Sequence, residues 1–382
     1  MRAGMRRVVI VGGGVGGAFT ANKLATKAFA KVKKGELEVV VVEPEENVVY
    51  QPGFLYVPFK ELPSEVMFRP VRKVLHPLVN LVKKPATKID VKNRKVVLGD
   101  GSEIQYDYLV LATGAVVKTD HFPGFKKVWH TFWTYEGAKA LREALSKFAK
   151  GTLVFSVAST PFKCPVAPYE FLFYFDDVLM KTGRKKDVKI VFTTVAPHLH
   201  AQPNVNKFLE EEFRNRGIEY RTKFEVKEVR EGEVVGPETL KGDLIIVVPK
   251  HTAAEVAFNS GLVDQGGWVP VDKYTLQIAG GNGVEYAIGD TTNLAVPKAG
   301  SVAHFQSEVV ADRIYEDMEF GHADSVYNGR VICFILTGTE EATQVSWNYD
   351  GPALYPVPSN KFMMRLKDLT NFSIWSAVRC GL

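Results

Sequence analysis

The stretch Arg6-Arg7-Val8-Val9-Ile10-Val11-Gly12-Gly13-Gly14-Val15-Gly16-Gly17 decides the fold. Its β-branched half predicts a buried strand, and a helical pattern follows over residues 18–29. The glycines have the spacing G-x-G-x-x-G: Gly12 allows a tight turn, Gly14 lets the backbone approach a pyrophosphate, and Gly17 lets the helix pack on the strand. The positive end of that helix would face the pyrophosphate.

A second strand and an acid complete this unit. Leu37–Val42 is another β-branched run, and Glu43 follows it at the position that suits the two hydroxyls of a ribose. No basic residue stands directly after Glu43 to take a 2′-phosphate. Strand, glycines, helix, strand and acid in this order predict an adenine dinucleotide site.

Two later strands end in turns that suit the same cofactor. Residues 107–114 form an apolar strand with a small-residue turn at its end, and residues 284–290 form a strand that closes on an aspartate. Together with the glycine stretch, they resemble the two-dinucleotide flavoprotein superfamily. The resemblance implies that the first turn closes over FAD and that the aspartate binds its ribityl chain or pyrophosphate. The cofactor-binding residues expected from these motifs are Gly12, Gly14, Gly17, Glu43, Ala112, Thr113, Gly114, Gly289 and Asp290.

A second strand-turn unit starts at Gly151–Ser159, and Val188–Thr194 supplies another strong strand. In relatives that oxidise NADH, this unit carries a glycine fingerprint of its own. Here the turn reads Ser156-Val157-Ala158-Ser159-Thr160-Pro161, which has no glycine, and Pro161 lacks an amide donor. The sequence therefore predicts an α/β fold with two Rossmann-like domains, of which the second has lost its nucleotide fingerprint.

The second domain is expected to be an insertion in the first. We predict an FAD-binding domain over residues 1–115 and 256–320, a second Rossmann-like domain over 116–255, and a C-terminal part over 321–382. No repeats, low-complexity tracts or disordered linkers interrupt this order.

The C-terminal part is predicted to contain a hairpin and an amphipathic helix. Strands are expected over 331–336 and 342–347. In residues 360–382, apolar side chains follow helical spacing and cations fall mostly on the remaining face, as is typical of an interfacial helix that associates with a membrane. A helix docked on the body of the protein is the alternative. The residues in this pattern are Phe362, Leu366, Leu369, Phe372, Lys361, Arg365, Lys367 and Arg379.

A thiol stands where the second fingerprint is missing, in Thr160-Pro161-Phe162-Lys163-Cys164-Pro165-Val166-Ala167-Pro168-Tyr169-Glu170. The prolines indicate an irregular turn, and a helix is predicted to begin near Pro168. Cys164 would then lie just ahead of a helix N-terminus and beside Lys163, where the pKa of a thiol is lowered. The alternative is an inert cysteine in a tight loop. Cys333, in the middle of a predicted strand, has the same alternative.

Four further features indicate which family within this superfamily the chain resembles. They are Tyr50–Gly53, Lys163–Glu170, Pro297–Gly300 and Cys333 in its hairpin. With them, the chain resembles sulfide:quinone oxidoreductases and the related flavoprotein subunit of flavocytochrome c sulfide dehydrogenase, from Val8 to about Pro358.

The resemblance implies a chemistry. Cys164 and Cys333 would form a redox-active pair beside the flavin, Glu170 is a candidate base, and Lys298 would contact the flavin near the quinone side and offset its negative charge when reduced. Hydrosulfide would attack the disulfide and leave a persulfide and a thiolate. Sulfide would thus be oxidised to sulfur or polysulfide, with electrons passed through FAD to a membrane quinone. The residues that the resemblance adds to the FAD site are Gln51 and Pro52.

One departure from the family concerns cofactor attachment. Many members carry a third cysteine between the Ala-Thr-Gly turn and the second domain, sometimes joined covalently to FAD, but residues 115–150 contain no cysteine. The sequence therefore predicts non-covalent FAD. Cys380 is interpreted as incidental.

Three other functions stay open. A flavocytochrome-type subunit would need a haem partner on another chain, because no C-x-x-C-H site occurs here. A type II NADH:quinone dehydrogenase is opposed by the glycine-free second turn. A redox sensor or flavin-binding adaptor would bind FAD tightly without turnover of sulfide.

Composition restricts the partners and the location. The formal charge of +5 is a mild basic excess that does not indicate nucleic acid and suits an acidic lipid surface equally well. No run of eighteen apolar residues occurs, and no export signal precedes Val8, so we expect a peripheral membrane protein on the cytoplasmic face. Three cysteines are too few for a disulfide scaffold, no metal site is predicted, and a homo-oligomer is left open.

Overall fold

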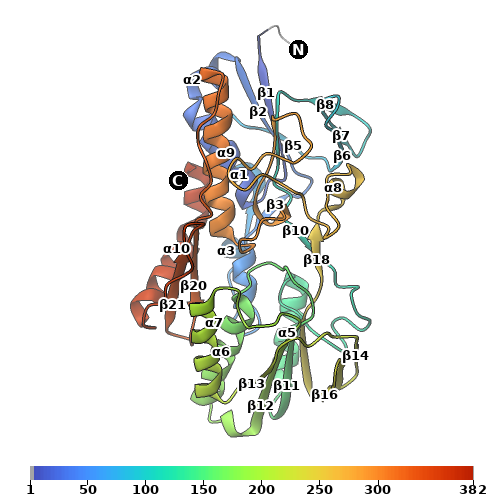
Figure 1. Ribbon diagram of the computed structural model, residues 1–382, viewed down its shortest axis with the longest axis vertical. Coiled ribbons are helices and arrows are strands. Elements are labelled where there is room, and N and C mark those ends of the chain that lie inside the picture. The colour runs from blue at the N-terminus through green and yellow to red at the C-terminus, as the bar shows by residue number, and fades with distance from the viewer. Residues whose placement is uncertain (1–3, 382) are drawn as a thin grey trace.

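The computed structural model describes residues 4–381 and contains two parallel sheets, which lie in the upper and lower halves of Figure 1. The strand order is β19-β9-β1-β2-β5 in the first sheet and β13-β12-β11-β17 in the second. The α/β fold is confirmed. The strands of the first sheet are β19 (Glu285–Ala287), β9 (Tyr108–Leu111), β1 (Arg6–Val11), β2 (Leu37–Val42) and β5 (Asn80–Val82). Those of the second are β13 (Glu219–Arg221), β12 (Val188–Thr194), β11 (Gly151–Val157) and β17 (Leu244–Val248).

The first sheet is covered on both faces, as expected for strands that are continuous apolar runs. Val8 and Ile10 of β1 pack in the same core as α1 and α9, whereas Val9 and Val11 point to the other face. That face is covered by a small antiparallel sheet and α8. The covering elements are α1 (Val15–Lys27), α9 (Gly300–Phe320), α8 (Glu255–Asn259), β6 (Ala86–Asp90), β7 (Lys95–Leu98) and β8 (Glu103–Gln105).

The first helix differs from its prediction. It begins at Val15, three residues before the predicted start, and is interrupted at Ala28, after which α2 runs from Phe29 to Lys34. The start is early because the glycines 16 and 17 are themselves helical. The break lies at the end of the buried part of α1, since no residue of α2 is buried.

The second sheet is also covered on both faces. Leu153, Phe155 and Val157 of β11 pack in one core with α5, α6 and α7, and Val154 packs on the other face with β14 and β15. The bounds are α5 (Tyr135–Lys147), α6 (Ala167–Lys181), α7 (Pro203–Arg216), β14 (Glu228–Arg230), β15 (Glu233–Val235) and β16 (Thr239–Lys241).

The chain passes between the two sheets at two places that lie side by side. β10 (Ala115–Val117) pairs antiparallel with β18 (His251–Ala253), so the outward and return crossings form one short ladder. The division into domains at 115/116, 255/256 and 320/321 stays a prediction.

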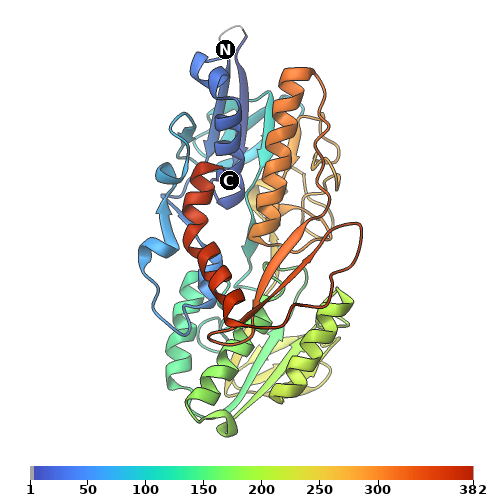
Figure 2. The same cartoon turned by 90° about the vertical axis from the view of Figure 1, so that its left-hand side faces the viewer.

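The C-terminal part forms a hairpin and one long helix. β20 (Val331–Leu336) pairs with β21 (Ala342–Trp347), which are the two predicted strand ranges. The helix α10 (Lys361–Cys380) has Asn360 as its N-cap residue. The side chain of Asn360 accepts a hydrogen bond from the Met363 amide at 2.8 Å. Figure 2 shows α10 running from the hairpin towards α1, where Asn22 donates to the Val378 carbonyl at 2.6 Å.

Short elements between β2 and β5 contribute to both cores: Val48 and Val71 pack in the core of the first sheet, and Phe54 and Met67 pack in the core of the second. These elements are β3 (Asn47–Val49), η1 (Gln51–Leu55), α3 (Ser64–Met67), β4 (Phe68–Pro70) and α4 (Val71–Val74). The remaining turns of helix are η2 (Lys185–Asp187) and η3 (Gly289–Thr291). Within residues 4–381, no helix is both long enough and apolar enough to cross a membrane.

Candidate active site

A cavity of about 590 Å³ brings together residues that are far apart in the sequence. Its walls come from η1, the start of α6, the start of α9, the strand β20 and the inner side of α10. Of the residues predicted for the site, the cavity is lined by Gln51, Pro52, Cys164, Glu170, Asp290, Lys298 and Cys333.

The glycine turn lies outside this wall, between β1 and α1, and its geometry suits a nucleotide. Gly12 has φ 104°, and a Cβ there would lie 2.5 Å from the Ala112 carbonyl oxygen. A Cβ on Gly17 would lie 1.9 Å from the Gly12 carbonyl oxygen, so strand, turn and helix require both glycines. At Gly14 nothing lies within 4 Å of an added Cβ. The structure thus leaves open the approach that a pyrophosphate needs.

Glu43 is held against the glycine turn. One carboxylate oxygen accepts from the Gly13 amide at 2.7 Å, and the other accepts from the Glu45 amide at 3.0 Å. Each oxygen keeps further acceptor capacity for a diol. Sequence reasoning missed Gly13, where a Cβ would lie 2.9 Å from the Glu43 side chain.

The two later turns meet beside the glycine turn. Thr113 Oγ1 donates to Thr291 Oγ1 at 3.4 Å, and the Gly289 amide donates to Gln306 Oε1 at 2.6 Å. The amide nitrogen of Gln306 is buried and has no partner within the described residues. A buried amide donor without an acceptor is costly unless a ligand meets it. The open space at Gly14, the carboxylate of Glu43 and the buried amide nitrogen of Gln306 are features that fit a flavin nucleotide.

Cys164 lies where the sequence places it, three residues ahead of α6. Its amide donates to the Lys298 carbonyl at 2.7 Å, its carbonyl accepts from Ala167 at 3.0 Å, and its φ is 54°. This left-handed conformation is unusual for a residue with a Cβ. The turn therefore holds the thiol on the cavity wall by backbone contacts on both sides.

The expectation that the pKa of Cys164 is lowered is wrong. Burial raises the pKa of this thiol well above its usual value, and the charges of Glu170 and Cys333 raise it further. The neighbouring Lys163 does not offset this, because its Nζ turns to Gln51 instead. Burial likewise raises the pKa of Cys333 to about 12.

The two cysteines come from different parts of the chain and line one cavity. Cys333 is the third residue of β20, and both side chains are half-buried free thiols. Their roles as a redox pair stay a prediction.

Glu170 forms a buried ion pair that sequence reasoning missed. Its Oε1 accepts from Lys367 Nζ at 3.0 Å and from the Leu336 amide at 3.0 Å. The exposed fractions of the two paired side chains are 14% for Lys367 and 3% for Glu170. Burial by itself would lower the pKa of Lys367, but the charge and the hydrogen bond of Glu170 raise it above its ordinary value.

Lys367 is one of the cations predicted for the polar face of α10, and its side chain lies against the protein. Lys367 belongs to the docked side of the helix, with Asn371 four residues later and Ile374 seven residues later, and all three line the cavity. The spacing of Lys367, Asn371 and Ile374 by four and three residues is the sequence pattern that could have indicated this.

Lys298 also lines the cavity, but its ammonium group is engaged. Nζ donates to the carbonyls of Asp290 at 2.9 Å and Thr292 at 2.7 Å, and it lies 3.5 Å from the centre of the Trp268 ring. Burial lowers the pKa of Lys298 to about 8.

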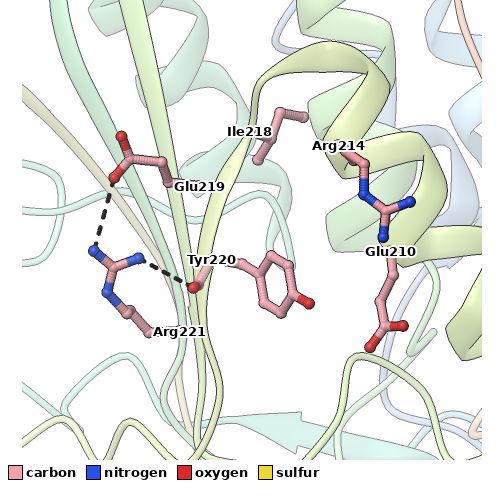
Figure 3. Close-up of a pocket in the computed structure, with 6 residues that line it drawn as sticks. All are labelled: Glu210, Arg214, Ile218, Glu219, Tyr220 and Arg221. Atoms are coloured by element: carbon pink, nitrogen blue, oxygen red, sulfur yellow. Dashed lines mark hydrogen bonds and ion pairs between the residues drawn. The ribbon is translucent and has the colours of Figure 1, made fainter.

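A second hollow, of about 500 Å³, lies between α7 and β13 on the lower half of the molecule. Figure 3 shows that Arg221 bonds to Glu219 and to the Tyr220 carbonyl on the β13 side of the hollow, while Glu210 and Arg214 extend from α7. Its charged groups are of both signs and none was predicted for a site. The cavity with the two cysteines is therefore the candidate active site.

Comparisons with known proteins find similar oxidoreductases. Residues 6–155 match the pyridine nucleotide-disulphide oxidoreductase family. The mitochondrial sulfide:quinone oxidoreductase of Dictyostelium discoideum is 28% identical over 90% of this chain and 78% of that protein. The mitochondrial sulfide:quinone oxidoreductase of Mus musculus is 24% identical over 98% of this chain and 86% of that protein.

Solved structures show the same fold. The sulfide:quinone oxidoreductase of Aquifex aeolicus superposes with a TM-score of 0.86 at 20% identity, covering 98% of this chain and 92% of that one. NDH2 of Plasmodium falciparum gives a TM-score of 0.70 at 13% identity over 99% and 96% of the two chains.

Proposed function

Since the chain belongs to the sulfide:quinone oxidoreductase family of pyridine nucleotide-disulphide oxidoreductase-type flavoproteins, we propose that it oxidises sulfide and passes the electrons through FAD to a quinone. The observation that carries the proposal is the meeting of Cys164 and Cys333 in one cavity, from segments 169 positions apart (333 − 164). Two thiols on one wall are what a disulfide exchange cycle needs.

The reaction uses the thiols in their disulfide form. Hydrosulfide attacks one sulfur of the Cys164–Cys333 bond, the S–S bond breaks, and a persulfide and a thiolate result. The cavity supplies Glu170 as the group that takes the proton of the incoming hydrosulfide. Lys367 positions Glu170 and, as a cation, stabilises the thiolate that leaves. FAD supplies a two-electron acceptor between the thiolate and the quinone.

The flavin is proposed to be held without a covalent bond. Residues 115–150 contain no cysteine that could form one, and the glycine turn with Glu43 provides a polar site for the nucleotide half. Acid or heat should therefore release all FAD from the purified protein. Yellow colour that stays with the denatured chain would contradict this.

A lipid surface is the proposed source of the quinone. The outer side of α10 exposes Phe362, Leu369 and Phe372, whose exposed fractions are 63%, 63% and 75%, while the inner side lines the cavity. One helix would thus connect the bilayer, on the cytoplasmic face, with the site. This combines the two alternatives for the segment, an interfacial helix and a docked helix.

The membrane proposal needs point variants. Removal of residues 360–382 would take away Lys367 and part of the cavity wall, so a truncated chain would lose more than its contact with lipid. We expect Leu369→Asp with Phe372→Asp to weaken sedimentation with anionic liposomes and to leave bound FAD unchanged. The control is Met180→Asp, an exposed apolar residue on α6. Equal binding by all variants would place the contact elsewhere.

The assay that tests the function compares electron donors. Purified protein should reduce decylubiquinone with sulfide and not with NADH. Reduction with NADH would favour a type II NADH dehydrogenase, which the fold also resembles. The turn after β11 argues against it, since Pro161 and Cys164 stand where a nucleotide would need glycines. Reduction of a haem protein in place of a quinone would favour the flavocytochrome-type function.

A further inference from the structure

Two lysines lie side by side on the cavity wall and differ in what their ammonium groups contact. Lys163 and Lys298 form a parallel β-bridge, so their side chains start from adjacent backbone positions. Both are almost fully buried, with exposed fractions of 9% and 6%. The sequence singles out Lys298 for the reduced flavin, but the contacts favour its neighbour.

The ammonium group of Lys298 has little capacity left. Two of its donors go to the carbonyls of Asp290 and Thr292, and the face of the Trp268 ring covers it. An ammonium group has three donors. Lys298 therefore fastens η3, the turn that follows β19, to the start of α9.

The ammonium group of Lys163 is less satisfied. Within residues 4–381 its only hydrogen-bond acceptor is Oε1 of Gln51 at 2.8 Å, a neutral amide oxygen. Two donors remain. Burial lowers the pKa of Lys163, and the charge of Asp290, which forms no ion pair with it among the described residues, opposes this lowering. A buried cation without a direct ion pair is costly, on the order of several kcal/mol. Such a group is retained where a ligand brings negative charge.

The surroundings keep Lys163 in place. Its carbonyl accepts from Trp133 Nε1 at 2.7 Å, and the next amide, that of Cys164, is bonded to the Lys298 carbonyl. The backbone is thus fixed on both sides of the lysine, and its side chain lines the same cavity as both cysteines. The cation is placed before any ligand arrives.

We propose that Lys163, rather than Lys298, is the cation that meets the negative charge of the reduced flavin. The inference rests on the proposed function, in which FAD occupies the cavity and takes up two electrons and one proton from the sulfide side. The flavin then carries one more negative charge than before. A cation with free donors binds this form more tightly than the oxidised form, and so raises the reduction potential of the bound FAD.

The test measures the midpoint potential of FAD bound to the holoprotein, by dye-equilibrated reduction with dithionite, which needs neither sulfide nor quinone. Lys163→Met should weaken binding of reduced relative to oxidised FAD at least tenfold, which lowers a two-electron potential by about 30 mV. Lys163→Arg should restore most of the shift. Lys298→Met is the matched control and should change the potential less, while lowering the melting temperature.

A second variant avoids removal of a buried side chain. Gln51→Glu keeps the shape and gives Lys163 a carboxylate partner, so it should lower the potential in the same direction as Lys163→Met. The inference is overturned if Lys163→Met and Gln51→Glu leave the potential unchanged, or if Lys298→Met shifts it more. Protein purified without any flavin would overturn the proposed function together with it, whereas flavin with an unaltered potential would overturn this inference alone.

Discussion

The turn after β1 and the turn after β11 occupy the same position in two similar strand–turn–helix units, but they present different groups. Each leaves the end of a central parallel strand and enters a helix, α1 or α6. The first turn is built of glycines and leaves open space at Gly14. The second contains Pro161 and places Cys164 at φ 54° beside the cavity. A strand–turn–helix unit can therefore present either backbone amides to a phosphate or one side chain to a reaction, depending on which residues form its turn.

The cost of the second arrangement is backbone strain. A left-handed conformation at a residue with a Cβ costs of order 1 kcal/mol and persists where neighbours fix it. Here the bonds from the Cys164 amide to Lys298 and from Ala167 to the Cys164 carbonyl fix it. The left-handed backbone at Cys164 directs the thiol towards the cavity. In the first turn, the glycines instead leave the backbone amides accessible.

The largest effect is expected from replacing the thiol of the second turn, or its partner thiol, and concerns turnover with sulfide. Cys164→Ser and Cys333→Ser should each lower sulfide-driven reduction of decylubiquinone by about 10³-fold or more, because each sulfur has its own step in the exchange cycle. Bound FAD, measured by absorbance, should stay at the level of the unmodified protein. Cys380→Ser, on the exposed end of α10, is the control and should keep full turnover. Substantial turnover by either active-site variant would mean that the pair is structural.

A smaller effect is expected from the cation that supports the second turn. Lys367→Met leaves Glu170 buried without its partner, so it should lower kcat by about 10–100-fold and the free energy of unfolding by ~3–5 kcal/mol. Lys361→Met on the same helix is the matched control. Its exposed pair with Glu340 should contribute at most ~1 kcal/mol. Equal results for the two lysines would argue that α10 does not act on the site.

The test of the first turn uses Gly14, where an added Cβ would contact no other atom. Gly14→Ala should leave the melting temperature of the FAD-free protein unchanged, because an added Cβ meets no atom within 4 Å. It should weaken FAD binding by about tenfold, or ~1.4 kcal/mol, because the Cβ occupies the approach of the pyrophosphate. The control is Ser159→Ala in the second turn, which should bind FAD with unchanged affinity. Flavin fluorescence titration measures the affinity of both variants for FAD. A weaker affinity of Ser159→Ala would contradict the contrast between the turns.

The last effect depends on pH and concerns the ladder that joins the two units. Burial holds the pKa of His251, on β18, down to about 3, against 6.5 for an ordinary histidine. Between these values the unfolded chain binds a proton that the folded chain does not, so the free energy of unfolding rises with pH across this window. The slope contributed by one group is at most about 1.4 kcal/mol per pH unit. His251→Phe should flatten the pH dependence of the melting temperature from pH 4 to 6.5, and an unaltered dependence would contradict it.

The positions of the elements could be predicted well wherever local pattern dominates. The strands 331–336 and 342–347 and the start of α6 agree with prediction, because alternation, apolar runs and proline act within a few residues. The first helix was placed three residues late, since glycine lowers helix propensity and the packing of Gly17 on the strand overrides it. Local pattern did not predict that Cys164 and Cys333 lie together; that expectation came from the resemblance to a family, and the structure places both on one cavity.

Local sequence patterns predict the order of the units: the glycine turn with Glu43, the glycine-free turn with Cys164, and a last helix with one apolar face. These follow from spacing and from the few residues that each turn tolerates. Only the tertiary structure decided which charges meet. It turned Lys367 inward to Glu170, fastened Lys298 to two carbonyls, and left Lys163 with one neutral partner. The reason is that the energy of a buried charge depends on burial and on neighbours distant in the chain, and neither is written in local spacing.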